Sequence, residues 1–382
     1  MEVWAWGANN YGQLGIGTKC EQIDKPVKIS LPLECNIERG SFRIVGGGGH
    51  TLLTNSENKR LFAAGWNHKG QLGLKNDNTD VENFSEVSVH TDINNLRHKV
   101  ITKLACGWDF SAILYEDGSV FVSGSNAFGQ IGLGEELKSV TTFVEITTLS
   151  GIKIVDISCG MRHMLFVDDK GNVYSTGCGK KGQLGLGDSV KKVFTPTLIN
   201  EFSTAVSVNC GQHFSVVITT SQTGCEMFTF GDNKYKQVSY TSNNTFYTPQ
   251  FKLTSSQLEA KFLSVDCGWT HVVILIDCSD KYKVISWGRN SYGQLGSTNP
   301  CDSKGHTYVE LDEEPIKIVS GYEHVLVVAK SGKLLTWGWN EHSNCGVGDS
   351  NQNFFQPQLV TFENKKVDNC YTGSAHSFAL VQ

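Results

Sequence analysis

The sequence predicts an all-β fold, a seven-bladed β-propeller of four-stranded blades that is closed by pairing of its N- and C-terminal strands. Three observations predict it. A glycine that closes a short apolar or aromatic strand recurs seven times, at intervals of 50 to 59 residues. A second glycine, with a small residue before it and a ring three positions after it, also recurs seven times. The chain starts in the third strand of one repeat and ends in the second strand of another.

The first signature ends a strand and opens a turn. The strand-closing glycines are Gly7, Gly65, Gly124, Gly177, Gly231, Gly288 and Gly338. In five repeats the sequence Gly-Gln-Leu-Gly, or a near copy, begins five residues later, whereas the copies at 236–239 and 343–346 have diverged. Two residues after each closing glycine stands an Asn, or Gly179 in one repeat, and both residue types tolerate positive φ. We therefore expect a left-handed turn residue at Asn9 and at its six equivalents.

The second signature belongs to the innermost strand of each blade. The residue before the second glycine is always small, and in four repeats it is a cysteine, namely Cys106, Cys159, Cys210 and Cys267. We expect these thiols to pack in a crowded inner strand. The ring position holds His50, Phe110, His163, Phe214, His271, His324 and His376. Because Phe replaces His twice, packing explains this position better than metal binding or acid–base catalysis. The sequence predicts no catalytic residue, no metal site and no cofactor.

Each repeat is expected to contain four short strands, as at residues 42–45, 51–54, 61–64 and 84–89. Proline stands at or near the start of the fourth strand in several repeats, at Pro26, Pro196, Pro249 and Pro357. Proline is confined to sheet edges, so this strand should form the rim. The strand at 3–6 should pair with the strand at 377–381 and remove two open edges. We expect one domain, 1–382, whose seam blade is shared by residues 1–30 and 340–382.

Composition narrows the functional classes. The 33 basic and 38 acidic residues give a net charge of -5, so there is no basic surplus for a phosphate backbone. The adjacent pairs Lys180–Lys181, Lys191–Lys192 and Lys365–Lys366 are interpreted as solvated loops. Direct nucleic-acid binding is disfavoured. Apolar runs are far shorter than the ~20 residues of a membrane-spanning helix, and the N-terminus has no signal-peptide pattern. We expect a soluble monomer in the cytoplasm, with the nucleus as a second location.

The paired signatures resemble the repeat family of the regulator of chromosome condensation over essentially the whole chain. The segments GGGGH at 46–50, CGWDF at 106–110, GWTH at 268–271 and WGWNEH at 337–342 are similar to the branch of that family linked to secretion. The resemblance implies engagement of a small GTPase or of the secretory machinery. It further implies nucleotide exchange, an activity that needs no covalent catalysis. A noncatalytic adaptor that holds a GTPase or a vesicle-tethering subunit is the alternative.

Two departures from the family pattern bear on exchange. The chromatin-bound exchange factor of this fold drives a hairpin wedge, inserted in one blade, towards the nucleotide, but only six residues separate Gly124 from Gln130 at that place. The family also uses acidic side chains in two loops where this chain has Asp109 and Arg162. Asp109 fits, whereas Arg162 reverses the charge. Exchange on the Ran GTPase is therefore disfavoured, and another GTPase stays open.

The two variable positions between the second glycine and the ring are the predicted partner-binding face, because a rigid ring supports loops whose identity the repeat does not fix. They include Trp108, Asp109, Arg162, Gln212, Trp269, Thr270, Tyr322 and Glu323. Aromatic residues and Arg dominate protein interfaces. The alternative is that Trp108 and Trp269 cap the central shaft. A light-sensing role like that of the plant ultraviolet-B receptor is disfavoured, because these tryptophans lie in nonadjacent repeats and are expected to be too far apart to cluster.

Overall fold

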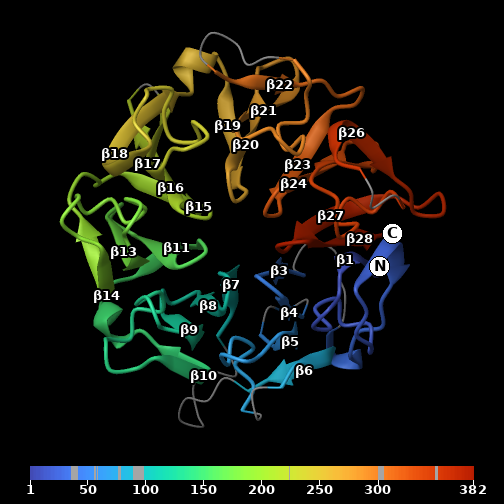
Figure 1. Ribbon diagram of the computed structural model, residues 1–382, viewed down its shortest axis with the longest axis horizontal. Helices are drawn as coiled ribbons and strands as arrows, with labels where there is room; N and C mark the ends of the chain where they lie inside the picture. The colour runs from blue at the N-terminus through green and yellow to red at the C-terminus, as the bar shows by residue number, and fades with distance from the viewer. Residues whose placement is uncertain are drawn as a thin grey trace.

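The computed structural model describes residues 1–35, 42–55, 57, 59–75, 79–88, 99–222, 224–299, 305–348 and 352–382. Within them the strands form seven four-stranded sheets, arranged as blades around a central shaft (Figure 1). Neighbouring strands of each sheet are antiparallel. The predicted seven-bladed propeller is confirmed.

Each of the six complete blades runs from an innermost to an outermost strand in chain order. The first two complete blades are β3 (Ile44–Gly46), β4 (His50–Thr54), β5 (Leu61–Gly65), β6 (Val81–Val87), and β7 (Ile101–Cys106), β8 (Phe110–Tyr115), β9 (Val120–Ser125), β10 (Ser139–Glu145). The next two are β11 (Ile154–Cys159), β12 (His163–Asp168), β13 (Val173–Cys178), β14 (Lys192–Ile199), and β15 (Ala205–Cys210), β16 (Phe214–Ser221), β17 (Gly224–Asp232), β18 (Thr245–Thr254). The last two complete blades are β19 (Lys261–Cys267), β20 (His271–Asp277), β21 (Tyr282–Gly288), β22 (Thr307–Val309), and β23 (Pro315–Ser320), β24 (His324–Ala329), β25 (Leu334–Gly338), β26 (Phe354–Val360). Short 3-10 turns lie at η1 (Leu33–Cys35), η3 (Thr147–Leu149) and η4 (Ser256–Leu258).

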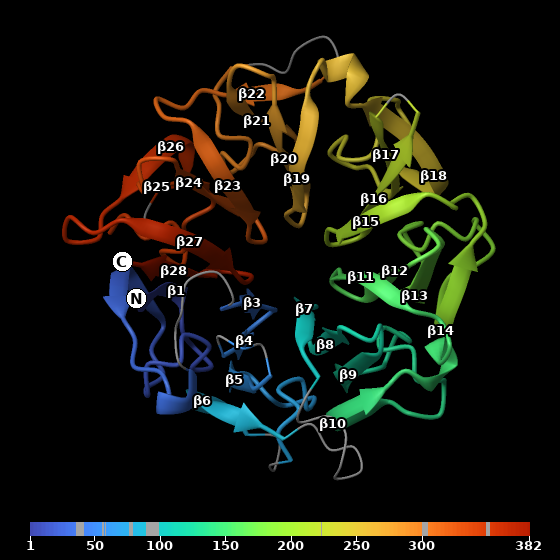
Figure 2. The ribbon, with the colours of Figure 1, turned by 180° about the vertical axis from the view of Figure 1, so that it is seen from behind.

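The seam blade joins the two ends of the chain. It consists of β27 (Val367–Thr372), β28 (His376–Val381), β1 (Glu2–Ala8) and β2 (Gln22–Lys28). Strands β1 and β28 pair from Glu2 opposite Val381 to Gly7 opposite His376, and the termini lie beside each other in both views (Figures 1 and 2). The predicted closure is therefore confirmed. The C-terminal share of this blade begins at Val367, not at 340 as expected, because β26 belongs to the preceding sheet.

The core lies between the faces of neighbouring sheets. Three of its largest buried side chains, Trp6, Trp287 and Trp337, stand directly before a strand-closing glycine. Each indole Nε1 donates a hydrogen bond to a backbone carbonyl in the turn of the preceding blade, over 2.9 to 3.1 Å. A buried Trp needs such an acceptor, so these contacts join apolar packing to blade spacing.

The expectation of a left-handed residue at the Asn position is wrong. Asn9 and its equivalents are absent from the residues with positive φ, and the turn glycines adopt it instead, as at Gly12 (φ 82°) and Gly15 (φ 66°). The buried Asn side chain instead holds the turn together by hydrogen bonds, because Asn9 Oδ1 accepts from the Leu14 amide and Asn9 Nδ2 donates to the Thr18 carbonyl. In the two diverged turns Lys236 (φ 66°) and Ser343 (φ 57°) occupy the place of the first turn glycine.

The outermost strands contain prolines, as predicted for a rim, but each proline lies within its strand rather than at the start. In each case the register with the third strand shifts just there, for example between the Ser175–Thr197 and Gly177–Val193 pairs that bracket Pro196. A bulge removes the need for a ladder N–H, and this explains how proline is accommodated. In the first complete blade the fourth strand begins at Val81, earlier than expected, and Val89 lies outside the described residues.

The ring position explains the second glycine. A Cβ on Gly160 would lie 2.1 Å from His163 Cε1, and a Cβ on Gly107 or Gly211 would lie 1.9 Å from Cε1 of Phe110 or Phe214. Only glycine therefore leaves room for the ring that follows three residues later.

Four of the ring histidines donate to a hydroxyl on the next blade. The Nε2 to oxygen distances are 2.9 to 3.0 Å in the pairs His50–Ser111, His163–Ser215, His324–Ser377 and His376–Thr51. Each hydroxyl in turn donates to a backbone carbonyl of the neighbouring turn. Because the hydroxyl proton is used in this way, Nε2 must carry a proton and donate it to the hydroxyl oxygen. Burial lowers the pKa of these four histidines to about 3. A packing role for the ring position, as opposed to metal binding or acid–base catalysis, therefore accounts for these contacts.

Candidate partner-binding site at the mouth of the central shaft

A circle of backbone hydrogen bonds surrounds one mouth of the shaft. In each blade the residue after the second glycine donates its amide to a carbonyl of the next blade, over 2.6 to 3.4 Å. The donors are Gly48, Trp108, Met161, Gln212, Trp269, Tyr322 and Ser374. We call this circle the collar. It links all seven blades, and therefore fixes the first variable position of every loop close to the axis.

The large side chains of the collar meet at the axis. The rings of Trp269 and Tyr322 stack with centroids 4.0 Å apart. Trp108 reaches them from the far side of the ring, 5.6 Å from Trp269 and 6.0 Å from Tyr322. Trp66 extends the cluster outward at 6.5 Å from Trp108. We call Trp108, Trp269 and Tyr322 the aromatic plug.

The expectation that Trp108 and Trp269 lie too far apart to cluster is wrong. Their loops belong to nonadjacent blades, but every collar position lies near one axis, so two long side chains can span the shaft. Sequence separation in a closed ring therefore says little about distance at the centre. All three plug residues are half-buried, and Trp269 Nε1 is buried without a hydrogen-bond partner among the described residues. Trp108 and Trp269 therefore lie where the alternative interpretation places them, across the mouth of the central shaft.

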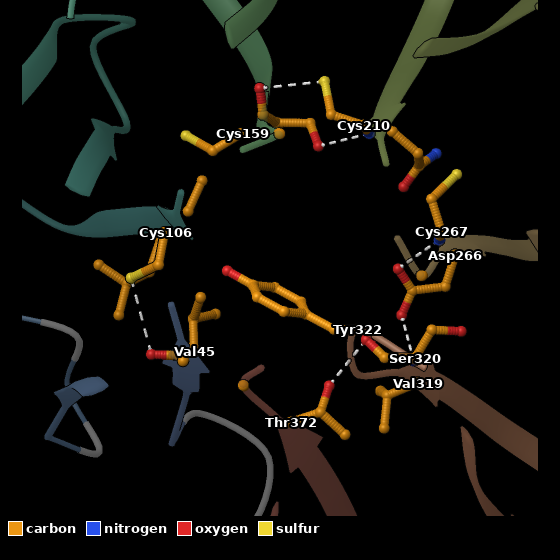
Figure 3. A pocket seen from close by; sticks show the side chains of 18 of the residues that line it. Val45, Cys106, Cys159, Cys210, Asp266, Cys267, Val319, Ser320, Tyr322 and Thr372 are labelled. Atoms are coloured by element: carbon orange, nitrogen blue, oxygen red, sulfur yellow. Dashed lines mark hydrogen bonds between the residues drawn. The ribbon is translucent and has the colours of Figure 1, made fainter. Parts of the chain in front are cut away.

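A cavity of about 350 Å³ lies in the shaft and is lined by inner strands of every blade. The Tyr322 ring projects into it, and Cys106, Cys159, Cys210 and Cys267 stand around it (Figure 3). Burial raises the pKa of the Cys106 and Cys210 thiols to about 12, and that of the Cys159 and Cys267 thiols well above the usual range. The thiols are therefore protonated at neutral pH, which fits a packing role.

The second variable position behaves differently from the first. Asp109 is half-buried, accepts a hydrogen bond from Gln130 Nε2 at 3.3 Å, and has a pKa raised by burial. The Arg162 guanidinium lies over the Phe128 ring, 4.2 Å from its centroid. Both side chains remain accessible beside the collar.

Thr270 and Glu323 are buried, with 5% and 6% of their surface exposed. The Thr270 hydroxyl lies 2.8 Å from each carboxylate oxygen of Glu323, and Gln294 Nε2 donates to the same carboxylate at 2.6 Å. His271 Nδ1 lies 3.8 Å from Glu323 Oε2, and neither nitrogen of this buried ring has a hydrogen-bond partner among the described residues. These two side chains therefore face each other rather than a partner. A partner-binding role for the predicted face stays a prediction.

Sequence reasoning missed the outward-facing residues of the turns. The fourth position after each strand-closing glycine holds Tyr11, Lys69, Phe128, Lys181, Tyr235, Tyr292 and His342. These side chains are half-buried or exposed, and they stand beside the collar loops. Their variability between otherwise constant turn residues was the available signal, since the repeat does not dictate them.

The place of the family's wedge is a compact turn. Strand β9 is followed by residues 126–138, all described, which contain no strand. The Asn126 side chain donates to the carbonyls of Gly134 and Leu137, both at 2.7 Å, and this draws the turn closed. No hairpin therefore projects there. Among the described residues no cluster of three or more potential ligands could hold a metal, and no helix is long and apolar enough to cross a bilayer.

The geometry is that of a seven-bladed propeller whose repeats carry one collar residue each, and the chain belongs to the RCC1-like domain family, whose model matches residues 2–379. It is 32% identical over 410 residues to the secretion-regulating guanine nucleotide exchange factor of Bos taurus, covering 100% of this chain and 83% of that protein. It is 25% identical over 402 residues to the regulator of chromosome condensation of Homo sapiens, covering 100% and 90% respectively. The family resemblance predicted from the repeats is confirmed.

The same fold is found in a solved structure. Prp20p from Saccharomyces cerevisiae superimposes with a TM-score of 0.85 at 19% identity, covering 100% of this chain and 91% of that one. That protein was described together with its binding to Gsp1p and histones. At this identity the likeness shows the fold.

Proposed function

We propose that this protein regulates a small GTPase linked to secretion, and that it acts as a guanine nucleotide exchange factor through its loop face. The observation that carries the proposal is the similarity along the whole chain to a protein named as a secretion-regulating exchange factor. Exchange requires only that the protein bind the nucleotide-free GTPase more tightly than the nucleotide-bound form. No covalent chemistry, metal or cofactor of the propeller is needed. We place the protein in the cytoplasm, and also in the nucleus, as a monomer.

The collar supports this proposal. It holds seven loops on one rigid frame, and a preorganised frame lowers the entropic cost of binding. Asp109 and Arg162 stand beside the collar with part of their surface accessible, on neighbouring blades. A partner that presses on this mouth would contact these side chains and the turn residues around them.

A noncatalytic adaptor that holds a GTPase or a vesicle-tethering subunit is the second candidate. The compact turn at residues 126–138 favours it, because the hairpin that displaces nucleotide in the chromatin-bound relative has no counterpart there. An exchange factor would then need another element to reach the nucleotide.

The decisive experiment captures partners from lysate on the intact protein and follows release of fluorescent GDP from each captured GTPase. Faster release supports exchange, and binding with unchanged release supports the adaptor. Arg162→Ala should weaken binding of the partner, whereas the exposed Lys153→Ala, at the opposite end of the inner strand β11, should not. Failure to retain any GTPase, under conditions where the relative retains its own, would rule out exchange. Failure to retain a vesicle-tethering subunit as well would rule out the adaptor.

A further inference from the structure

Charge is distributed very unevenly over the loop face. In the three consecutive blades β11–β14, β15–β18 and β19–β22, the described loops of this face comprise residues 160–162, 178–191, 211–213, 232–244, 268–270 and 289–299. Their basic residues are Arg162, Lys180, Lys181, Lys191, Lys234, Lys236 and Arg289, and their acidic residues are Asp188 and Asp232. We call these seven cations the basic arc. The chain as a whole carries a net charge of -5, so the arc is a local reversal of sign.

The corresponding described loops of the other four blades are acidic on balance. Their basic residues are Lys19, Lys69, Lys75 and Lys138, and their acidic residues are Glu21, Asp80, Asp109, Glu135, Glu136, Glu323 and Glu341. The loop face therefore has a positive half and a negative half. This asymmetry is hidden in the overall composition.

Most of the basic arc is not neutralised within the protein. Lys191 pairs with Asp188, and Lys181 Nζ lies 3.6 Å from Asp232 Oδ1. The other five cations have no carboxylate at ion-pair distance among the described residues. These are Arg162, Lys180, Lys234, Lys236 and Arg289. Lys180 and Lys234 are exposed and the other three are half-buried.

The arc is continuous across the blades. The Lys181–Asp232 contact joins the β13 and β17 turns. Arg289 lies between the rings of Tyr235 and Tyr292, with its guanidinium carbon 4.9 and 4.3 Å from their centroids, so it joins the β17 and β21 turns. The arc follows the rim of the collar through these three blades, the green to orange part of the ring in Figure 1.

Aromatic rings hold two of the guanidinium groups in place. Arg162 lies over Phe128, and Arg289 lies against two tyrosines. A guanidinium held against a ring loses less entropy on binding a carboxylate, and that of Arg289 is held further by a hydrogen bond from its Nε to the Ser291 hydroxyl. Because a guanidinium already lies over one face of each of these rings, that face cannot stack with a base, and this favours an acidic protein segment over nucleic acid. The negative half would also repel a long polyanion.

We propose that the basic arc is a docking surface for an acidic segment of a partner protein. The proposal deepens the proposed function, since it specifies the chemistry of the partner that binds this mouth. The negative half of the face gives that partner a fixed orientation, because a segment with its acidic end on the arc avoids like charges on the other side.

The test measures binding of a fluorescein-labelled oligoglutamate peptide of about ten residues to the full chain by fluorescence anisotropy. The triple variant K180Q/K234Q/R289Q removes three arc cations that have no internal carboxylate partner. The control K153Q/K261Q/K283Q removes three exposed lysines at the opposite ends of inner and third strands, with the same change in net charge. Thermal unfolding of each variant reports whether the fold is retained. No GTPase is present, so the outcome is independent of the exchange assay.

We expect the arc variant to weaken peptide binding about tenfold, and the control to change it less than about twofold, with the affinity falling as salt rises. Equal losses in the two variants would mean that binding follows net charge alone and would overturn the proposal. Absence of peptide binding to the unmodified chain would also overturn it. Tighter binding of a single-stranded oligonucleotide of matched charge, lost in the arc variant, would assign the arc to nucleic acid instead.

Discussion

The pairing of ring and hydroxyl around the propeller can be tested as a chemical rule. In four of the five repeats with a ring histidine that ring faces a hydroxyl on the next blade, and His271 is the exception. The two ring phenylalanines share buried clusters with apolar residues at that place, Phe110 with Met164 and Phe214 with Val272. The rule predicts that His163 and Ser215 are energetically coupled. The perturbation is therefore a double-mutant cycle of His163→Phe and Ser215→Val.

The size of the coupling follows from two hydrogen bonds. His163 Nε2 lies 3.0 Å from Ser215 Oγ, and Ser215 Oγ donates to the Gln183 carbonyl at 2.8 Å. A buried polar group left without a partner costs about 1–3 kcal/mol. When His163 is present, Ser215→Val leaves two buried groups without a partner, the His163 Nε2–H and the Gln183 carbonyl. When Phe replaces His163, only the Gln183 carbonyl is left without a partner. We therefore expect a coupling free energy of about 2 kcal/mol, with the double variant more stable than the sum of the single changes predicts.

The assay is equilibrium unfolding in urea at pH 7.5, followed by tryptophan fluorescence for all four proteins. Thermal midpoints are less sensitive, because in a chain of this length about 1 kcal/mol shifts the midpoint by only about 1 °C. As a control, Phe214→His alone should destabilise the fold, because Val272 offers the new ring no acceptor. Additive effects of the two changes at His163 and Ser215 would refute the rule, since they would show that the hydrogen bond contributes nothing beyond shape.

Three further predictions concern acid stability, backbone strain and the aromatic plug. The four hydroxyl-paired histidines have a pKa of about 3 in the folded protein against an ordinary value near 6.5, so the stability they contribute is fully present above about pH 6.5 and is lost as the pH falls towards 3. Between pH 7 and 5, His163→Phe should therefore reduce the pH dependence of the free energy of unfolding by about one proton. An unchanged pH dependence would contradict the assignment. Lys236→Gly should raise the free energy of unfolding by about 0.5–1 kcal/mol, because glycine adopts the left-handed backbone at this position without strain. Gly182→Ala should lower the free energy of unfolding by more than that, because its Cβ would lie 2.3 Å from a backbone oxygen. A loss of stability on Lys236→Gly would show that no strain is stored. Trp108→Ala should change the near-ultraviolet circular dichroism of the stacked rings while the far-ultraviolet spectrum is retained, and an unaltered near-ultraviolet spectrum would mean that Trp108 does not contact Trp269 in solution.

The repeat signatures allowed the fold to be predicted because each constant residue has a backbone reason. Gly160 must be glycine for His163 to fit above it, and Gly12 must turn where its amide bonds back to Asn9. Such requirements are local and recur in every blade, so they are visible in sequence. The expectation of a left-handed residue at the Asn position was equally local but failed, because a residue type that tolerates positive φ need not adopt it. The Asn9 side chain is needed instead for the hydrogen bonds that hold the turn together.

The candidate site was only partly predictable, because its residues are brought together by ring closure. The two variable loop positions were identified, but the alternation between them was not. The first position is fixed near the axis by the collar, so Trp108 meets Tyr322 across the ring, while the second position directs Thr270 into a buried contact with Glu323. The basic arc was missed for another reason. Each lysine pair is an ordinary solvated loop by itself, and only the order of blades around the ring makes them neighbours.

Divergence of one turn can be explained by the charge that it adds. In the turn after β17, Lys236 replaces the first turn glycine of the repeat and has a φ of 66°, which glycine would adopt without strain. This lysine lies in the basic arc. A side chain that costs stability where it stands persists when it contributes elsewhere, and its contribution here would be electrostatic. Lys236→Gly should therefore move two properties in opposite directions, raising the stability of the propeller while weakening its affinity for the acidic peptide. The equivalent positions in the other two blades of the arc are glycines, Gly182 and Gly293, so within the arc this trade-off between strain and binding is specific to Lys236.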